Sequence, residues 1–397
     1  MIPKLLRRDL CIARHLSWSH RPSQAFSTAS VRHGLQRSLP AAYYRGGTSR
    51  AVFFKKNDLP PHRSDWDEIF RRVLGSPDPN GRQLDGLGGG ISSLSKVCVV
   101  DKSDRLDADV DYTFVSLGVK TSQVDYSSNC GNMISAVGPF AVDSQLVTVN
   151  SEGRSDAELR ILNTNTGKII RSRFPVVDGE ADSSGSFAID GVAGTGAKIQ
   201  LDFLDPAGSR TGQMLPTGEV VNTFDGIRTT CIDVGNPCCF VLASELGFPG
   251  TITPDEIEAH PALLGRLDYI RRQAGVVMGL AEKPELVPGS VPKIGMVSAP
   301  DSTVVVDVVV RALSVGQPHR AVPITVALAL AAAAKLPTSV VAEVTSPQPM
   351  HPAGITLGHA SGSLIVRAEF KDDGSLSHAT VFRTARRLME GRVFWKG

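Results

Sequence analysis

The apolar residues of this chain fall into many short runs separated by Gly, Pro and small polar residues, a pattern typical of short strands joined by tight turns. The segment AAYYRGGTSRAVFF predicts a strand, a glycine turn and a second strand, and a third strand is predicted over residues 97–100. Further strands are predicted in VDYTFVSLGV, LVTVN, AELRILNTNTGKII and AKIQLDFLD. The segment SDWDEIFRRVLGS predicts a helix that has acidic residues in its first turn and ends at Gly75.

From about residue 225 the same order of patterns begins again. Strands are predicted in RTTCIDVG, CCFVLASELG, KIGMVSA and VVVDVVVRAL, one long helix in TPDEIEAHPALLGRLDYIRRQAGVVMGLA, and a second helix in TVALALAAAAKLP. Each half places polar residues directly before an apolar helix, which indicates a weak internal repeat in an α+β chain.

The stretch VDYSSNCGNMISAV, residues 124–137, sets a cysteine directly before an apolar helix. Ser127, Ser128 and Asn129 are good capping residues, and Gly131 lets the backbone approach a ligand closely. A helix N-terminus attracts anions and favours the thiolate form of a nearby cysteine, so Cys130 is a candidate acid or base. Pro139 predicts a short or kinked helix. The alternative is a small buried cysteine beside a cap.

Lys96 follows the loop GLGGGISSLS, whose small residues would let its side chain enter a crowded cleft. Burial there would favour the neutral amine and hence proton transfer. The alternative is a solvated lysine at the start of a strand.

A second polar cluster, RALSVGQPHRAVPIT, precedes the helix of the second half. Arg311, Ser314 and His319 are residue types that bind carboxylates, and Thr325 is predicted to cap the helix. The alternative is a polar loop before a capped helix, which needs no ligand.

Composition excludes several classes of protein. The chain has 397 residues, 42% of them apolar, and its longest uncharged apolar run, at 324–334, is shorter than the roughly 20 residues that cross a bilayer. No basic face interleaved with aromatic residues indicates nucleic-acid binding. The glycine-rich loop lacks the GxGxxG and GK[ST] nucleotide motifs, and GHASG has the wrong spacing for a nucleophile elbow. Six cysteines show neither disulfide nor zinc spacing.

The first 37 residues have the composition of an organelle transit peptide, with seven basic residues against one acid. We therefore predict a mitochondrial address; a disordered basic arm on a cytoplasmic protein is the alternative. The remaining chain has 35 basic and 39 acidic residues, so the apparent basicity lies in this leader.

Six segments, in order, resemble the methylaconitate cis-trans isomerase family, which is related to 4-oxalomesaconate tautomerases, methylitaconate isomerases and aconitate isomerases. They are YYRGGTSRAVFF, GGGISSLSKV, DYSSNCGNM, GTGAKIQLDFLDPAGSRTGQMLPTG, DVGNPCCFV and HRAVPITVALALAAAA. The resemblance implies an α+β fold of two similar diaminopimelate epimerase-like domains, each a mixed sheet around a central helix, with the active site in the cleft between them. It implies domains at 38–225 and 226–375, with 376–397 returning to the first.

The resemblance also implies that Lys96 and Cys130 are the proton-transfer pair. Because the substrate's carboxylates already acidify its C–H bonds, we expect that no metal or organic cofactor takes part. Candidate carboxylate-binding residues are Arg45, Ser49, Asn129, Gly131, Asn132, Asn236, Arg311, Ser314, His319 and Thr325. Where racemases of this fold have a second cysteine this chain has Pro323, which argues against amino-acid racemisation. Departures from the family pattern at Arg50 and Val326 leave the particular substrate open.

These features predict a cofactor-independent isomerase that moves a double bond, or switches its geometry, in an unsaturated di- or tricarboxylate such as 2-methylaconitate or aconitate. The resemblance further implies a homodimer, and no nucleic-acid or membrane partner is expected. The alternative is a catalytically silent tricarboxylate-binding partner of an aconitase-like dehydratase.

Overall fold

A computed structural model describes residues 36–127, 129–149, 152–302 and 305–396, and Gln36–Lys396 form one compact unit. The predicted transit peptide lies outside the described residues, apart from its last two positions. Arg37, the last of these, already begins the first strand.

The strands of residues 37–204 pair in a fixed order. β1 to β2 is antiparallel, β2 to β3 parallel, β3 to β4 and β4 to β5 antiparallel, β4 to β6 parallel, and β6 to β7 and β7 to β9 antiparallel. Their bounds are β1 Arg37–Gly46, β2 Ser49–Lys55, β3 Lys96–Lys102, β4 Val110–Leu117, β5 Val124–Asp125, β6 Arg154–Asn163, β7 Lys168–Val177 and β9 Ile199–Leu204.

The strands of residues 227–383 repeat this order. β11 to β12 is antiparallel, β12 to β13 parallel, β13 to β14 and β14 to β15 antiparallel, β14 to β16 parallel, and β16 to β17 and β17 to β18 antiparallel. Their bounds are β11 Ile227–Asp233, β12 Pro237–Leu242, β13 Lys293–Ser298, β14 Val308–Ser314, β15 Gln317–Pro318, β16 Ile355–His359, β17 Gly362–Phe370 and β18 Leu376–Arg383.

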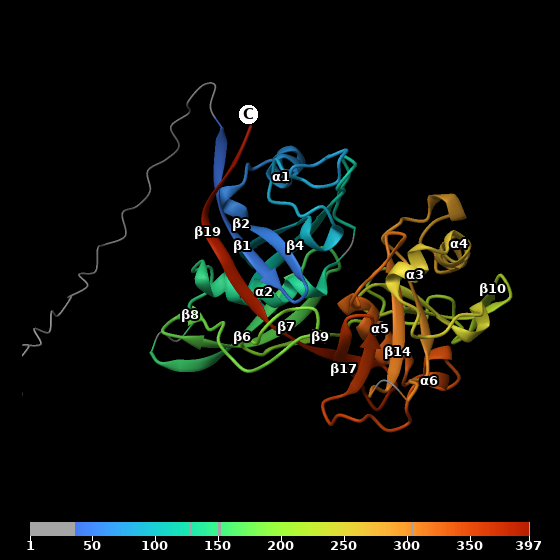
Figure 1. The fold of residues 1–397 in the computed structure, drawn as a ribbon. Coiled ribbons are helices and arrows are strands. Elements are labelled where there is room, and N and C mark those ends of the chain that lie inside the picture. The colour runs from blue at the N-terminus through green and yellow to red at the C-terminus, as the bar shows by residue number, and fades with distance from the viewer. Residues whose placement is uncertain (1–35, 128, 150–151, 303–304, 397) are drawn as a thin grey trace, which may run out of the picture. The chain divides into compact units, whose positions relative to one another are not determined.

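One pairing joins these two sets of strands into one large mixed sheet, and a second pairing adds the last strand to the first set. β18 pairs antiparallel with β9, and β19 (Ala385–Trp395) pairs antiparallel with β1, beside which it runs in Figure 1. The short strands β8 (Glu180–Ala181) and β10 (Asn222–Phe224) extend β7 and β11. The chain therefore has a mixed α+β fold.

A buried helix lies at the centre of each set of strands. α2 (Gly131–Asp143) follows β5 and packs against β1, β2, β7, β8 and β19, whereas α5 (Ile324–Ala333) follows β15 and packs against β11, β12, β17 and β18 (Figure 1). Both helices are buried along almost their whole length, as expected of mainly apolar helices enclosed by sheet. α2 continues through Pro139 for one further turn.

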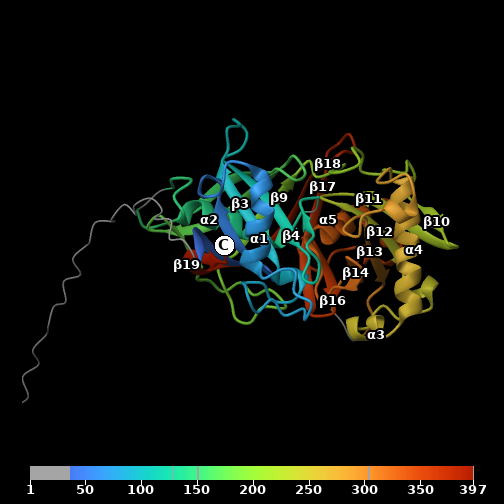
Figure 2. The same ribbon diagram turned by 90° about the horizontal axis from the view of Figure 1, so that it is seen from above.

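The outer helices differ from the prediction in one respect. α1 (Trp66–Leu74) ends at Gly75, whose φ of +73° suits a glycine C-cap. The long helix predicted from Thr253 is two helices, α3 (Pro254–Glu258) and α4 (Pro261–Val277), because the residue before a proline disfavours helical geometry. α4 lies beside β10 and β13 (Figure 2). The remaining helices are α6 Val340–Val344 and the 3₁₀ turns Lys56–Asp58, Arg63–Asp65, Ser92–Leu94, Ser244–Leu246 and Pro284–Leu286.

Two strand predictions were also wrong in part. Residues 146–149 form no strand, because Leu146 N and Val147 N donate to Ala141 O and turn the chain away from the end of α2. β14 begins only at Val308, so the start of VVVDVVVRAL is not part of the strand. No helix in the described part of the chain is long and apolar enough to cross a bilayer.

Candidate active site

Lys96 and Cys130 are in direct contact. Lys96 is the first residue of β3 and Cys130 is the N-cap residue of α2, and Lys96 Nζ donates to Cys130 Sγ over 3.2 Å. Nζ also donates to Ser49 Oγ over 3.0 Å. Ser49 begins β2, the parallel neighbour of β3, so both side chains lie at the same end of the strands. The local fold thus brings an amine, a thiol and a hydroxyl together.

These residues line a pocket that is open to solvent, and most of the predicted site residues line it with them. The predicted residues in its wall are Ser49, Lys96, Asn129, Cys130, Gly131, Asn132, Ser314, His319 and Thr325. The other lining residues include Ser92, Phe114, Asp125, Lys293 and Pro323.

Gly131 allows the N-termini of the two central helices to meet. A Cβ atom at position 131 would lie 2.4 Å from Ile324 Cβ, closer than such atoms approach, so only glycine permits this contact. The first amides of each helix have no partner within the helix, and here they belong to Gly131 and Asn132 in α2 and to Ile324 and Thr325 in α5. All four residues line the pocket, so two positive helix ends converge on it.

The predicted helix caps were wrong. Cys130 itself is the N-cap of α2, without a side-chain cap hydrogen bond, and Asn129 instead accepts at Oδ1 from Asn163 Nδ2 over 2.7 Å. Ser127 N donates to Asp125 Oδ1, and Ser128 lies outside the described residues. In α5 the N-cap is Pro323, which has no cap side chain, and Thr325 is the second helical residue. Without caps, the first amides remain available to a ligand.

Three predicted residues do not line the pocket. Arg45 Nη1 donates to Gly47 O and Thr384 O, and the buried Arg311 donates to Ile252 O and Val310 O. Asn236 is fully buried behind Thr325. With its amide oriented to satisfy both polar atoms, Nδ2 donates to Gly235 O over 3.0 Å and Oδ1 accepts from Lys293 Nζ over 3.1 Å.

Lys293 is a pocket residue that sequence reasoning missed. It begins β13 and is only 7% exposed. Burial lowers the pKa of Lys293, and among the smaller effects the negative charge of a Cys130 thiolate would raise it and the charge of Lys96 lowers it. The described part of the pocket wall thus has two lysines, Lys96 and Lys293, against one carboxylate, Asp125.

His319 faces the pocket as a neutral ring. Burial of most of the ring lowers the pKa of His319 to about 4, and the charges of Lys96 and Lys293 lower it further. Nδ1 accepts from Ala321 N over 3.1 Å, which leaves the ring proton on Nε2. His319 is therefore a hydrogen-bond donor without charge at neutral pH.

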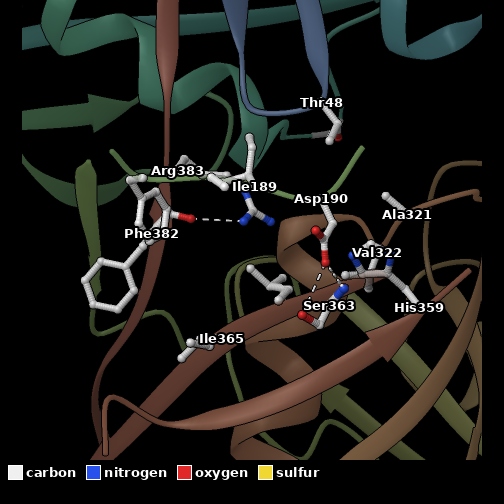
Figure 3. A pocket seen from close by; sticks show the side chains of 13 residues that line it. Thr48, Ile189, Asp190, Ala321, Val322, His359, Ser363, Ile365, Phe382 and Arg383 are labelled. Atoms are coloured by element: carbon white, nitrogen blue, oxygen red, sulfur yellow. Dashed lines mark hydrogen bonds between the residues drawn. The ribbon is translucent and has the colours of Figure 1, made fainter. Parts of the chain in front are cut away.

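A second pocket adjoins the first through Asn132. It is drawn in Figure 3, where Arg383, Asp190 and His359 lie around it and Asp190 accepts from Ser363 N. Arg383 Nε donates to Asn132 Oδ1 over 3.2 Å, and Asn132 Nδ2 donates to Thr48 Oγ1 over 3.1 Å. The side-chain amide of Asn132 is thus held by Arg383 and Thr48, which line the second pocket, while Asn132 itself lines the first.

Across the described ranges, no group of three or more His, Cys, Asp or Glu side chains is arranged to hold a metal ion.

Comparison with known proteins gives a consistent result. Residues 36–396 match the family described as PrpF protein. The chain is 37% identical over 378 residues to the 3-methylitaconate isomerase of Eubacterium barkeri, covering 90% of this chain and 97% of that protein. It is 37% identical over 394 residues to the 2-methyl-aconitate isomerase of Cupriavidus necator, covering 91% and 98%.

Solved structures agree with this result. A methylitaconate-delta-isomerase structure superposes with a TM-score of 0.76 at 36% identity, covering 91% of this chain and 96% of that chain. A hydroxyproline epimerase from Agrobacterium vitis shares the fold alone, with a TM-score of 0.53 at 12% identity over 90% of this chain and 93% of that chain.

Proposed function

The chain belongs to the PrpF protein family and is an isomerase, and from this premise we propose that it isomerises an unsaturated di- or tricarboxylate by proton transfer at Lys96 and Cys130. The observation that carries this proposal is the 3.2 Å contact of Nζ with Sγ in a pocket where two helix N-termini converge. An amine and a thiol in contact can exchange a proton, and the helix ends favour an anionic ligand.

In the proposed reaction one of the two groups removes a proton from the carbon next to the double bond. The electron pair of that C–H bond enters an extended enolate that includes a carboxylate. The proton is then returned to another carbon, which moves the double bond, or to the same carbon after rotation, which switches cis to trans. Either outcome conserves all atoms and electrons and needs no oxidant.

The contact between Lys96 and Cys130 also restores the starting state. If one group takes the proton and the other gives one, the two groups end the reaction with their protonation exchanged. Transfer along the 3.2 Å hydrogen bond then returns the proton without solvent. Ser49 Oγ accepts from Nζ and keeps the amine directed toward the thiol.

Stabilisation of the enolate is assigned to the amides of Gly131 and Asn132 and to Nε2–H of His319. Donors placed where negative charge develops contribute roughly 3 to 4 kcal/mol each to barrier lowering in other enzymes. A neutral His319 donates without competing with Lys96 for the proton.

The relatives narrow the substrate class. One is named a 3-methylitaconate isomerase and another a 2-methyl-aconitate isomerase. We propose methylaconitate, aconitate and methylitaconate as the first compounds to test, since all are unsaturated polycarboxylates.

We further propose that residues 38–225 and 226–375 are two similar diaminopimelate epimerase-like domains with the pocket in the cleft between them. The repeated order of strand pairing and the two central helices support this division. The pairing of β19 with β1 supports a return of residues 376–397 to the first domain.

An NMR assay in D2O tests the proposed function. The full-length protein is incubated with each candidate acid, and the expected result is conversion to an isomer, with deuterium entering at the carbon that receives the proton. A silent tricarboxylate-binding protein would broaden or shift substrate signals without isomerisation or deuterium uptake, and that outcome would refute the proposal.

A mitochondrial location and a homodimer remain predictions. The first rests on the composition of residues 1–37 and is tested by fusing these residues to a fluorescent protein. Fluorescence spread through the cytoplasm would contradict it.

A further inference from the structure

Lys293 is a buried cation with little compensation from the protein. Its side chain is in the wall of the catalytic pocket and is 93% inaccessible to solvent. Within the described residues its Nζ forms no ion pair, and its one acceptor is Asn236 Oδ1 at 3.1 Å. Of the three N–H bonds of an ammonium group, two are left for a ligand.

Burial of the Lys293 ammonium group is unfavourable in free energy unless an anion binds to it. A buried ammonium loses several kcal/mol of hydration free energy, and attraction to an opposite charge must offset that loss. Among the described residues that line the pocket, Asp125 is the single carboxylate, and its Oδ1 already accepts from Ser127 N. The two lysines of the pocket therefore exceed its acidic residues by one charge.

Lys293 lies beside the N-terminus of α5, and together they form a binding site for a carboxylate. Lys293 and Thr325 are neighbours at one amide atom of Asn236, because Oδ1 in the orientation that satisfies both polar atoms lies 3.1 Å from Lys293 Nζ and 3.4 Å from Thr325 Oγ1. Lys293 is thus beside the N-terminus of α5, whose Ile324 and Thr325 amides are free of helical partners. An ammonium group and two amides at a helix N-terminus form a binding site for a carboxylate.

Lys293 lies on different elements of the fold from the proton-transfer pair. Lys96 and Cys130 lie at β3 and the N-terminus of α2, whereas Lys293 and Thr325 lie at β13 and the N-terminus of α5. The two groups come from corresponding positions of the repeated strand order, since β13 follows β12 as β3 follows β2. Each helix N-terminus thus has a lysine from the start of a corresponding strand.

We infer that Lys293 and the first amides of α5 bind a second carboxylate of the substrate, the one that is not part of the enolate. This inference rests on the proposed function and deepens it. It makes Lys293 a substrate-binding and specificity-determining residue that holds the substrate beside Lys96 and Cys130. An unsaturated monocarboxylate has no second carboxylate for Lys293 to bind, so Lys293 does not increase its affinity.

The test compares Lys293→Met with Lys283→Met, an exposed lysine ten residues earlier. Tricarballylate, a saturated tricarboxylate that cannot be isomerised, serves as the binding probe in isothermal titration calorimetry. Lys293→Met is expected to weaken binding at least about tenfold, because hydrogen bonds to a charged group contribute roughly 1.5 to 3 kcal/mol. Lys283→Met is expected to bind as the wild type does.

Kinetics give a second readout. For the substrate found in the NMR assay, Lys293→Met is expected to raise KM more than it lowers kcat, because the carboxylate is held in both ground and transition states. Equal tricarballylate affinity and equal KM in Lys293→Met and Lys283→Met would overturn the inference while leaving the proposed function intact. Failure of the wild type to isomerise any candidate acid would instead overturn the proposed function.

If Lys293→Met does not fold, the NMR signal of Lys293 in the wild-type protein gives a separate test. The lysines of the wild type are labelled biosynthetically with ¹³C at Cε, which leaves every N–H bond in place, and the Lys293 signal is assigned from its loss in Lys293→Arg. Addition of tricarballylate is expected to shift that signal, whereas an equal ionic strength of NaCl is not. A signal unmoved by saturating tricarballylate would contradict the inference.

Discussion

Lys96 Nζ donates a hydrogen bond to Cys130 Sγ over 3.2 Å, although the two residues are 34 positions apart in the chain. The contact requires β3 to begin at the level where α2 begins, and Ser49 at the start of the neighbouring β2 holds Nζ in place. Proton transfer between two carbons of one substrate needs an acid and a base in the same small pocket, and Lys96 and Cys130 are such a pair.

Cys130 is expected to be the cysteine that thiol reagents modify fastest within residues 36–396. It is partly exposed, whereas Cys98, Cys231, Cys238 and Cys239 are buried, and burial raises the pKa of Cys238. Iodoacetamide is expected to modify Cys130 at least about tenfold faster than these four and to abolish turnover. Peptide mass mapping measures the rate of modification at each cysteine and distinguishes Cys11, which lies outside residues 36–396, from the other five. Protection by tricarballylate is expected, and equal labelling with and without it would place Cys130 outside the ligand site.

Gly131→Ala is expected to lower kcat/KM by at least about tenfold, because its Cβ would force Ile324 and the two helix N-termini apart. The matched control is Gly265→Ala in α4, where a Cβ meets nothing within 4 Å. That change is expected to leave kcat/KM unchanged and to raise the free energy of unfolding by about 0.5 to 1 kcal/mol. Full activity in Gly131→Ala would show that the close contact of α2 and α5 is not needed.

Stability is expected to fall as pH is lowered from 6.5 toward 4. Burial lowers the pKa of both His319 and His359 from 6.5 to about 4, so in this window the unfolded chain takes up protons that the folded chain does not. Each such proton changes the free energy of unfolding by up to about 1.4 kcal/mol per pH unit. Above pH 6.5 the two histidine rings are neutral in both the folded and the unfolded chain, so they no longer make the free energy of unfolding depend on pH.

His359→Gln is expected to reduce that slope, because glutamine takes up no proton. His351→Gln is the control: His351 Nδ1 accepts from Ala353 N as His359 Nδ1 accepts from Ser361 N, but His351 is exposed. Urea unfolding at several pH values measures the slope, and identical slopes in His359→Gln and the wild type would contradict the assignment.

Dialysis against EDTA is expected to leave turnover unchanged, because the substrate carboxylates acidify the C–H bond and Lys96 and Cys130 move the proton. Activity lost on dialysis and restored by a divalent cation would contradict a cofactor-independent reaction.

Most strands up to β14 and the proton-transfer candidates could be predicted from local sequence, whereas β16 to β19 were not predicted. Cys130 stands directly before an apolar helix and Lys96 at the start of a strand, so both positions can be recognised in the order of residues alone. The long helix from Thr253 was not predicted correctly, because Pro261 interrupts an otherwise helical pattern.

The ligand-binding residues were harder to predict because their roles depend on distant contacts. Arg311 and Arg45 have the charge that a carboxylate needs, yet backbone carbonyl oxygens already occupy their guanidinium groups. Lys293 looks like any lysine at the start of a strand, and only the packing of β13 near α5 buries it in the pocket. The sequence order shows residue types but not which polar groups remain unpaired after folding.

The turnover of Lys96→Met, Cys130→Ser and the double variant tests the central claim most directly. If the two residues act as one proton-transfer unit, each single change is expected to lower kcat by at least about a hundredfold, and the double change to cost little more than either alone. Circular dichroism confirms folding in each case. Near-wild-type turnover in either single variant, or losses that multiply in the double variant, would contradict a shared role for this lysine and cysteine.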